Sequence, residues 1–424
     1  MKKIIYYIFL IFFVLTQNNS YSVISEINFP DENFLQQNKN AFVSGRVIDE
    51  RGFPVPYVKI IAGGKETQTD ASGKFSILDL PLPYDLTAAE RYSSTAVIYG
   101  NLSVSNPDIV LFGKPKKDYS NFVKAKVSFA KIPEGGSAVI KFISKDIFES
   151  GEEICKEGDS SVSIIVRWPF NQNSLRGQIA YIYKDKSGFK SSKFSEAVFY
   201  RDKKTTEFRI KSGSGNKIAS SVISVYFPGN DYSEKGFSLS ADFFNYYKNS
   251  GVVFFENEGS ESQFRTEVPD NLPMTFKLKV RGYAYKKDGS GFENYFYTSP
   301  GSIVKVETET PPELLTPSDN FLAVDGNTRF SYSSGTGAGI YVLQLSSINR
   351  DLNFFIVTGE REAKLGYLSR KEFRNENVQF RWKVRKYITY MTVDEFVKPS
   401  IFNNDFGYKA VITSAEKSFK TGYY

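Results

Sequence analysis

Short runs of alternating apolar and polar residues, closed by Gly, Asp, Asn and Ser turns, dominate this chain. Such runs occur at 178–183, 276–280, 340–345 and 380–384. Alternation with a period of two predicts half-buried β-strands. Sustained helical spacing is almost absent, and the best short helix candidates are 241–248 and 369–375. Many short strands with regular turns predict an all-β chain of tandem antiparallel β-sandwich modules.

The length of 424 residues allows about two to four domains. Composition shifts predict linkers at 112–117 and 308–312, the second stiffened by two prolines, and a softer boundary at 211–216. We therefore expect modules at 38–113, 119–210, 211–309 and 312–424. A single larger sandwich over 119–309 is the alternative.

A weak internal repeat supports the boundary within 119–309. Residues 176–189 read RGQIAYIYKDKSGF, and residues 281–292 read RGYAYKKDGSGF. The final phenylalanines, Phe189 and Phe292, are 103 residues apart, which is one sandwich length. Because each segment joins a strand to an Asp/Gly turn and a second strand, we expect two equivalent modules.

The N-terminus has the pattern of an export signal. Lys2 and Lys3 precede an unbroken apolar run of twelve residues at 4–15, and small-x-small spacing ends at Ser22. This pattern predicts a signal peptide at 1–22. A membrane span needs about 20 apolar residues, so no transmembrane span is expected after signal cleavage. The protein is expected to be exported to the periplasm, the outer membrane or cell surface, or the medium.

Composition excludes several kinds of chemistry. The chain has no histidine and one cysteine, Cys155, which excludes Ser-His-Asp and Cys-His nucleophiles, His-containing zinc sites and an intrachain disulfide. The net charge of +7 includes no long basic run, so no nucleic-acid partner is expected. Each module must be stabilised by core burial alone. Cys155, among acidic neighbours, is expected to be incidental.

Two linked motifs at 45–54 and 69–75 carry the most specific signal. Val43, Gly45 and Val47 alternate on one predicted strand face, and Asp70 and Gly73 fit a tight turn. A G-x-V-x-D-x-x-G-x-P run paired with T-D-x-x-G-x-F resembles the carboxypeptidase regulatory-like domain, a transthyretin-like seven-stranded sandwich, over 41–113. The matched residues are expected to be scaffold: Gly45, Asp49, Gly52, Pro54, Asp70, Gly73 and Phe75.

This resemblance implies a non-catalytic, carbohydrate-binding-like fold that is common at the N-terminus of bacterial envelope proteins. It does not imply peptidase activity, because the zinc carboxypeptidase catalytic domain requires histidine ligands and this chain has none.

The last segment, 312–424, resembles a fibronectin type III-like module, and 271–309 resembles the end of one. Phe380, Trp382 and Val384 would share one strand face, with Trp382 in the core. About 30 residues separate Tyr387 from Ser418, far more than a usual hairpin loop. That segment either forms a binding surface or contains extra strands.

Several catalytic and metal-binding motifs occur without their usual context. Residues 214–217, 318–320 and 420–422 match the S-x-x-K, S-D-N and K-T-G motifs of penicillin-binding proteins, but Ser214 lies in a Gly-Ser-Gly loop. Glycine-rich 335–339 precedes a strand and predicts a hairpin turn. Asp231 with Glu234, or Asp288, lacks the spacing of a calcium loop. No catalytic, cofactor-binding or metal-binding residue is predicted, and no cofactor is expected.

Dense aromatic runs are the remaining indication of function. On a strand, Glu293, Tyr295 and Tyr297 would share the face opposite Phe292, Asn294 and Phe296. The candidate ligand-binding aromatics are Tyr295, Tyr297, Tyr246 and Tyr247. They would stack on sugar rings or anchor a protein partner, or alternatively serve only in cross-strand packing.

The expected function is therefore that of an exported, non-catalytic binding protein of the bacterial cell envelope, with protein or carbohydrate partners, or a scaffold. The alternatives are a mechanical spacer and a glycan-active enzyme with an unrecognised carboxylate pair.

Overall fold

The computed structural model describes most of the chain after residue 39. The described residues are 40–50, 54–90, 95–113, 120–144, 149–169, 172–203, 205–211, 217–227, 229, 231–243, 252–259, 261–272, 276–365, 378–398 and 410–422. Within them the chain is all-β, as predicted, and its sheets pack as tandem sandwiches. The one helix in these ranges is the single turn α3 (Val393–Phe396).

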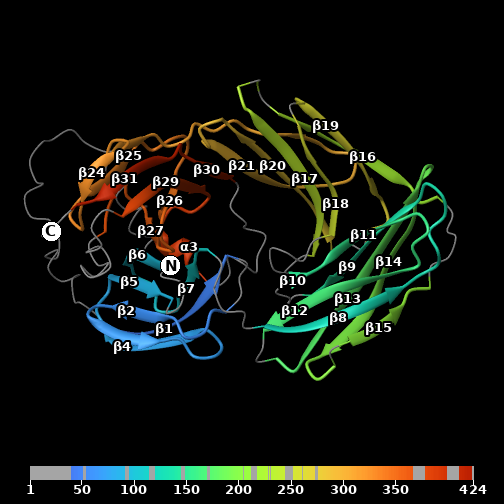
Figure 1. Ribbon diagram of the computed structural model, residues 1–424, viewed down its shortest axis with the longest axis horizontal. Coiled ribbons are helices and arrows are strands. Elements are labelled where there is room, and N and C mark those ends of the chain that lie inside the picture. Colours follow the sequence, from blue (N-terminus) through green and yellow to red (C-terminus); the bar gives the residue numbers. More distant parts are fainter. Residues whose placement is uncertain are drawn as a thin grey trace, which may run out of the picture. The chain divides into compact units, whose positions relative to one another are not determined.

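The first seven strands form two layers (Figure 1). They are β1 (Ala41–Asp49), β2 (Lys59–Ala62), β3 (Lys65–Gln68), β4 (Lys74–Leu80), β5 (Tyr84–Ala89), β6 (Thr95–Leu102) and β7 (Asp108–Leu111). One layer has the order β4-β1-β7, and the other contains β3-β2-β5-β6. The expected alternation is present in β1, because Val43 and Val47 are fully buried. Between them a Cβ on Gly45 would lie 2.5 Å from the Pro107 carbonyl oxygen, so only glycine fits.

The turn before β4 also has the expected form. The Asp70 Oδ1 atom accepts hydrogen bonds from the amides of Ser72 at 2.8 Å and Lys74 at 2.9 Å. Gly73 has a φ of +75°, and Phe75 returns to the core. Of the other matched residues, Asp49 is buried, whereas Gly52 lies outside the described residues.

Residues 120–305 contain two sandwiches with the same strand topology. The first has β8 (Ser120–Ser128), β9 (Ser137–Ile143), β10 (Glu149–Ser150), β11 (Glu152–Lys156), β12 (Ser161–Pro169), β13 (Ser174–Asp185), β14 (Gly188–Tyr200) and β15 (Thr205–Arg209). The second has β16 (Ser220–Tyr226), β17 (Glu234–Phe243), β18 (Val252–Glu258), β19 (Gln263–Pro269), β20 (Phe276–Tyr285), β21 (Gly291–Thr298) and β22 (Ile303–Lys305).

Their sheet orders correspond strand by strand. The order β11-β9-β13-β14 matches β18-β17-β20-β21, and β12-β8-β15 matches β19-β16-β22, with β10 added in the first sandwich. In each, the last strand runs parallel to the first: β15 to β8 and β22 to β16. The two repeat segments form equivalent hairpins, β13–β14 and β20–β21. In the intervening turns Asp185 and Asp288 accept amide hydrogen bonds from the residues two positions later.

The last strands form a further sandwich. They are β23 (Leu314–Thr316), β24 (Phe321–Val324), β25 (Arg329–Tyr332), β26 (Gly339–Ser347), β27 (Asn353–Thr358), β28 (Glu362–Lys364), β29 (Gln379–Ile388), β30 (Ala410–Thr413) and β31 (Lys417–Thr421). The three-stranded sheet β23-β25-β28 shares a core with β26, β27, β29 and β31. Trp382 is fully buried in it, as predicted. The long segment after Tyr387 contains α3 and the extra strand β30.

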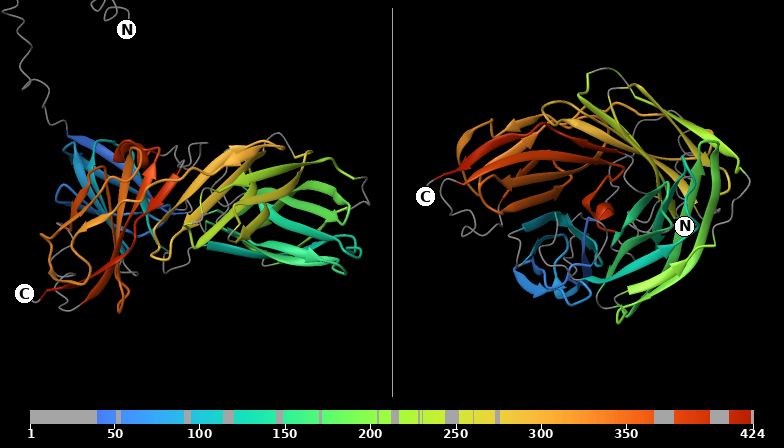
Figure 2. Two further views of the ribbon diagram at one scale, coloured as in Figure 1. Left: turned by 90° about the horizontal axis from the view of Figure 1, so that it is seen from above. Right: turned by 45° about the vertical axis from the view of Figure 1, so that its right-hand side comes forward.

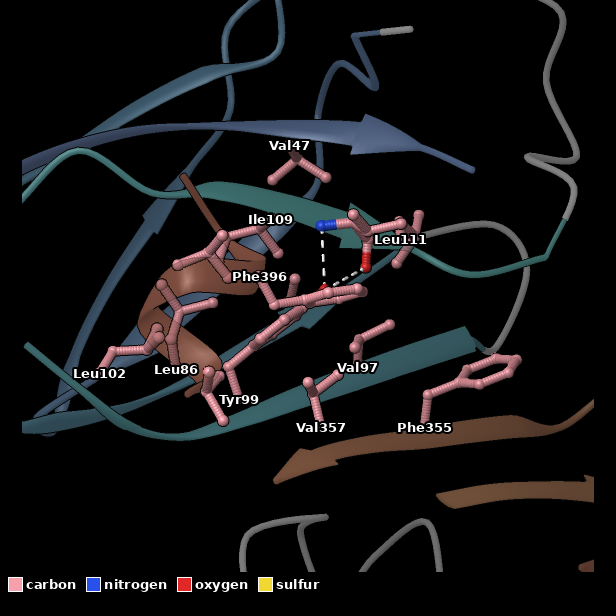
Figure 3. Close-up of a cluster of buried hydrophobic side chains, with 14 of the residues drawn as sticks. Val47, Leu86, Val97, Tyr99, Leu102, Ile109, Leu111, Phe355, Val357 and Phe396 are labelled. Carbon is pink, nitrogen blue, oxygen red and sulfur yellow. Dashed lines mark hydrogen bonds between the residues drawn. The ribbon is translucent and has the colours of Figure 1, made fainter. Parts of the chain in front are cut away.

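The first and last sandwiches are joined through a parallel pair, β6 with β27 (Figures 1 and 2). Their residues form one continuous core that includes Val357 and Phe396. Tyr99 lies in this core (Figure 3), where its hydroxyl donates to the Val110 carbonyl at 2.8 Å and accepts from the Val110 amide at 3.0 Å. The buried hydroxyl is therefore satisfied.

Two local expectations were wrong. Ala241 belongs to strand β17, not to a helix over 241–248, because the buried alternation of Phe237 and Leu239 continues through it. Phe112 is not a free linker residue, because it is buried and stacks on Phe355 and Phe396. The four module boundaries stay a prediction.

Candidate binding surface

The outward face of β20 and β21 carries a mixed row of tyrosines and charged side chains. We call this set the tyrosine–cation ladder: Lys277, Lys279, Arg281, Tyr283 and Tyr285 on β20 with Glu293, Tyr295 and Tyr297 on β21. The two strands are antiparallel, and Lys279 pairs with Tyr297 while Arg281 pairs with Tyr295. The expected division of β21 is confirmed, because Phe292 is fully buried on the opposite face.

Each cation of the ladder lies over a tyrosine ring. The distance from Nζ to the ring centroid is 5.4 Å for Lys277 and Tyr297, and 5.3 Å for Lys279 and Tyr295. The Arg281 guanidinium carbon lies 4.9 Å from the Tyr283 centroid. Lys279 reaches the ring of Tyr295, diagonal to its directly paired residue Tyr297, a separation that long side chains span. These contacts fix cationic and aromatic groups side by side on one face.

Glu293 connects three donors of the ladder through its carboxylate. Its Oε2 atom accepts hydrogen bonds from Arg281 Nε at 3.0 Å and the Tyr295 hydroxyl at 2.7 Å, and Oε1 accepts from the Tyr285 hydroxyl at 2.6 Å. Burial acts to raise the pKa of the Glu293 carboxyl, but these donors and the Arg281 charge outweigh it and lower the pKa to about 2. Glu293 is therefore a fixed anion within the ladder.

Exposure rises along the ladder. Tyr283 is buried, and its hydroxyl donates to Glu258 Oε1 at 2.8 Å. Tyr295 is half-buried, whereas Tyr297 is 43% exposed. Burial, with the charges of Glu258 and Glu293, raises the pKa of both Tyr283 and Tyr285, so their hydroxyls stay protonated donors. The accessible end of the ladder thus consists of Tyr297 with Lys277 and Lys279.

Two of the four predicted aromatics therefore lie together on one surface. Tyr295 and Tyr297 are neighbours on the same face of β21, and both take part in cross-strand packing. Tyr246 and Tyr247 lie outside the described residues. The lysines and Glu293 were not predicted as partners of the tyrosines, although the alternation of Lys277, Lys279 and Arg281 along β20 is visible in the sequence.

The penicillin-binding motifs have turn and strand roles where they are described. Asp319 Oδ1 accepts hydrogen bonds from the Ser418 amide at 2.7 Å and hydroxyl at 3.0 Å, which fastens the 318–320 turn to β31. Ser214 lies outside the described residues, and Lys420 and Thr421 belong to β31.

The glycine-rich segment 335–339 is not the hairpin turn that was predicted, because it connects β25 to β26 and these strands lie in different sheets. Its loop surrounds an ammonium group. Lys386 Nζ donates to the carbonyls of Ser334 and Thr336, each at 2.7 Å, and to that of Gly337. Lys386 is fully buried, and burial lowers its pKa although Glu309 opposes the shift. The loop is thus occupied by the protein's own cation and has no phosphate-binding arrangement.

Asp288, one of the candidate calcium ligands, and the cysteine have structural explanations. Asp288 Oδ1 is engaged by the amide and hydroxyl of Ser290 at 2.9 and 2.7 Å. Within the part of the chain that the structure describes, no three Asp, Glu or Cys side chains are grouped to hold a metal ion. Cys155 is buried, and burial with the charges of Asp159 and Glu153 raises its pKa to about 11, which leaves an unreactive thiol.

The described carboxyl groups give no sign of a general acid. Where a pKa departs clearly from its ordinary value, it is lowered in every described case: Asp70, Asp185, Asp288, Glu293 and Asp319. Glycosidases need one carboxylic acid with a raised pKa.

No helix in the described ranges is long and apolar enough to cross a bilayer.

Comparison with known proteins adds only distant structural similarity. No family model matches the chain, and no curated protein matches it. The Bacillus anthracis TIE protein is similar at 9% identity and a TM-score of 0.15, covering 63% of this chain and 50% of that one, so the chain spans half its length. The chicken CNTN1 FN1–FN3 domains give 10% identity and a TM-score of 0.17, covering 69% and 90% of the two chains.

BcpA, the major pilin subunit of Bacillus cereus, gives 8% identity and a TM-score of 0.15, covering 64% of this chain and 99% of that one. At these identities and TM-scores, the similarities carry no argument about function.

Proposed function

We propose that this chain is an exported, non-catalytic β-sandwich protein of the cell envelope that binds a protein or carbohydrate partner through the tyrosine–cation ladder. The observation that carries the proposal is the accessible end of the ladder, where the exposed ring of Tyr297 lies under Lys277 and is paired across the strands with Lys279. Tyrosine and cationic groups on a rigid sheet suit recognition of hydroxyl and carboxylate acceptors, as glycans and acidic protein surfaces present.

The rest of the ladder supports this role by fixing the accessible groups. Glu293 holds Arg281 and the Tyr295 hydroxyl in place, so less side-chain entropy is lost when a partner binds. The chain has no histidine, and each described carboxyl pKa that departs clearly from its ordinary value is lowered, whereas a glycosidase needs a general acid with a raised pKa. Both observations favour binding over catalysis. Export rests on the N-terminal signal pattern at 1–22, and the location remains the periplasm, the cell surface or the medium.

The family assignments belong to the same proposal. The seven strands of 41–111 in two layers support a carboxypeptidase regulatory-like module at 38–113. Buried Trp382 on β29 supports a fibronectin type III-like module at 312–424. The shared topology of the two middle sandwiches supports separate modules at 119–210 and 211–309.

The test compares two tyrosines that have the same kind of neighbour. Tyr297 lies under Lys277, and Tyr200, 46% exposed on β14, lies under Lys203 at 5.6 Å. Glycan arrays and pull-downs from envelope extracts should show a ligand retained by the wild type and by Tyr200→Ala but lost with Tyr297→Ala. Retention by Tyr297→Ala, or loss with both variants, would count against the ladder as the binding surface.

A further inference from the structure

A groove lies across one face of the sheet that joins the first and last sandwiches. Gln68 pairs with Lys59, Lys59 with Ala89, Ala89 with Ala96, and Ala96 with Phe354. Directly paired residues point to the same side of a sheet, so this row crosses five neighbouring strands on one face. The groove over it has a volume of about 770 Å³, within the range of ligand sites.

The groove changes character along the row. Ala96 and Phe354 are buried in the core of the last sandwich, and Ala89 and Leu352 pack partly against that core. At the other end, Lys59 and Glu66 form an exposed ion pair at 2.9 Å. The floor is therefore apolar near β27 and polar near β3, where no described strand pairs with the outer side of β3.

Glu90 lines the groove between these two ends. Glu90 is only 8% exposed. None of the described residues forms a hydrogen bond or an ion pair with its carboxylate. The carboxylate oxygens of Glu90 are not completely withdrawn from solvent, so they are open to the groove. A carboxylate that is largely shielded from water favours an opposite charge beside it. Lys59, the cation lining the groove, is instead paired with Glu66.

We propose that this groove binds a lysine-bearing segment of a partner protein, with the lysine ammonium paired to Glu90. Lys59 and Glu66 neutralise each other, so among the described lining residues the remaining charge is that of Glu90. The apolar floor suits the methylene stem of a lysine. The volume exceeds one side chain, so residues on either side of the lysine can also lie in the groove.

The site is separate from the tyrosine–cation ladder, so its fate does not depend on the function proposed for that surface. The probes are two capped pentapeptides, one with the sequence Ala-Val-Lys-Val-Ala and one with norleucine in place of lysine. Norleucine keeps the apolar stem and removes the charge. Isothermal titration of each peptide into the full-length protein measures the contribution of the ammonium group.

Two variants separate the buried carboxylate from overall charge. Glu90→Gln removes the proposed partner with little change in shape. Glu207→Gln removes a carboxylate that is 75% exposed on β15 and does not line the groove. Circular dichroism and thermal unfolding establish that both variants fold. We expect binding of the lysine peptide to weaken at least about 10-fold in Glu90→Gln and to change less than about 2-fold in Glu207→Gln.

The norleucine peptide should bind the wild type at least about 10-fold more weakly than the lysine peptide. The proposal is overturned if the lysine peptide does not bind the wild type, if norleucine binds equally well, or if folded Glu90→Gln binds as tightly as the wild type.

Discussion

The hairpins β13–β14 and β20–β21 occupy equivalent positions in two sandwiches of the same topology, yet their outward faces differ. The outward face of β13 contributes Ala180 and Ile182 to a small buried cluster, which Phe276 of the next sandwich helps to cover. Phe194 on β14 stacks against Phe276 with a centroid distance of 4.9 Å. The outward face of β20–β21 carries the tyrosine–cation ladder instead.

The difference shows that topology determines which residues share a face of the hairpin. The elements that pack against that face determine whether its residues are apolar or polar. Where another sandwich covers the hairpin, the outward residues are apolar and buried. Where the hairpin stays accessible, charged groups and tyrosines form hydrogen bonds with one another, as Arg281 and Tyr295 do with Glu293. Function is therefore expected on the second hairpin and not on the first.

A charge placed on the covered hairpin should have the largest effect. We expect Ile182→Lys, at a position 3% exposed, to lower the free energy of unfolding by about 3 kcal/mol or more, because the ammonium would be buried without a partner. Tyr297→Lys, at an exposed position of the other hairpin, should lower it by less than about 1 kcal/mol. Urea denaturation measures both, and equal losses would contradict the comparison.

Removal of the fixed anion should have the next largest effect. Glu293→Gln should lower the free energy of unfolding by about 2–3 kcal/mol at pH 7, since it weakens bonds from Arg281, Tyr285 and Tyr295. Glu207→Gln, whose carboxylate is 75% exposed, should cost less than about 0.5 kcal/mol.

The pH dependence of Glu293→Gln follows from the lowered pKa. Glu293 titrates near 4.5 ordinarily and near 2 in the folded chain, so its stabilisation is complete above the ordinary value. It is lost as the pH falls toward the folded value, because the unfolded state then binds the extra proton. The difference in free energy of unfolding between wild type and Glu293→Gln should therefore disappear as the pH falls from the ordinary to the folded pKa. A difference that persists at the lower pH would show that the pKa of Glu293 is not linked to stability.

A smaller effect is expected for one ladder hydroxyl. Tyr295→Phe removes the 2.7 Å hydrogen bond to Glu293 but keeps the ring under Lys279. The loss should be about 1 kcal/mol in chemical denaturation. In the Glu293→Gln variant, Tyr295→Phe should lower the free energy of unfolding by less than it does in the wild type. If the effects of the two substitutions were fully additive, the Tyr295 hydroxyl and the Glu293 carboxyl would not be coupled.

The smallest effect is expected at the exposed end of the ladder. A double-mutant cycle of Lys277→Ala and Tyr297→Ala should give a coupling energy of about 0.5 kcal/mol, because Tyr297 is 43% exposed and water screens the ammonium. Thermal unfolding of the four proteins measures it. A coupling as large as that at Glu293 would mean that this end is structural and not available for binding.

Much of the fold was predictable because it depends on local patterns. The turn residues Asp185 and Asp288 marked the two equivalent hairpins, and alternation around Trp382 placed it in a core. The faces of β21 followed from its period of two, which put Tyr295 and Tyr297 together. These features require only the residues within one strand or one turn.

The rest depends on pairings between distant parts of the chain. The cations over Tyr295 and Tyr297 follow from the register of β20 with β21, which no single strand reveals. The parallel pair of β6 with β27 joins Val97 to Phe355, which lie far apart in the sequence. The groove at Glu90 exists because of that pair, so the sequence alone gave no indication of it.

Site-specific photo-crosslinking tests the proposed binding surface most directly. A benzoylphenylalanine residue would replace Tyr297 or, as the matched control, Tyr200, which has the same kind of lysine neighbour on the other hairpin. The account predicts an adduct with an envelope protein or glycan after irradiation at position 297 and none at position 200. Adducts at both positions, or at position 200 alone, would contradict it.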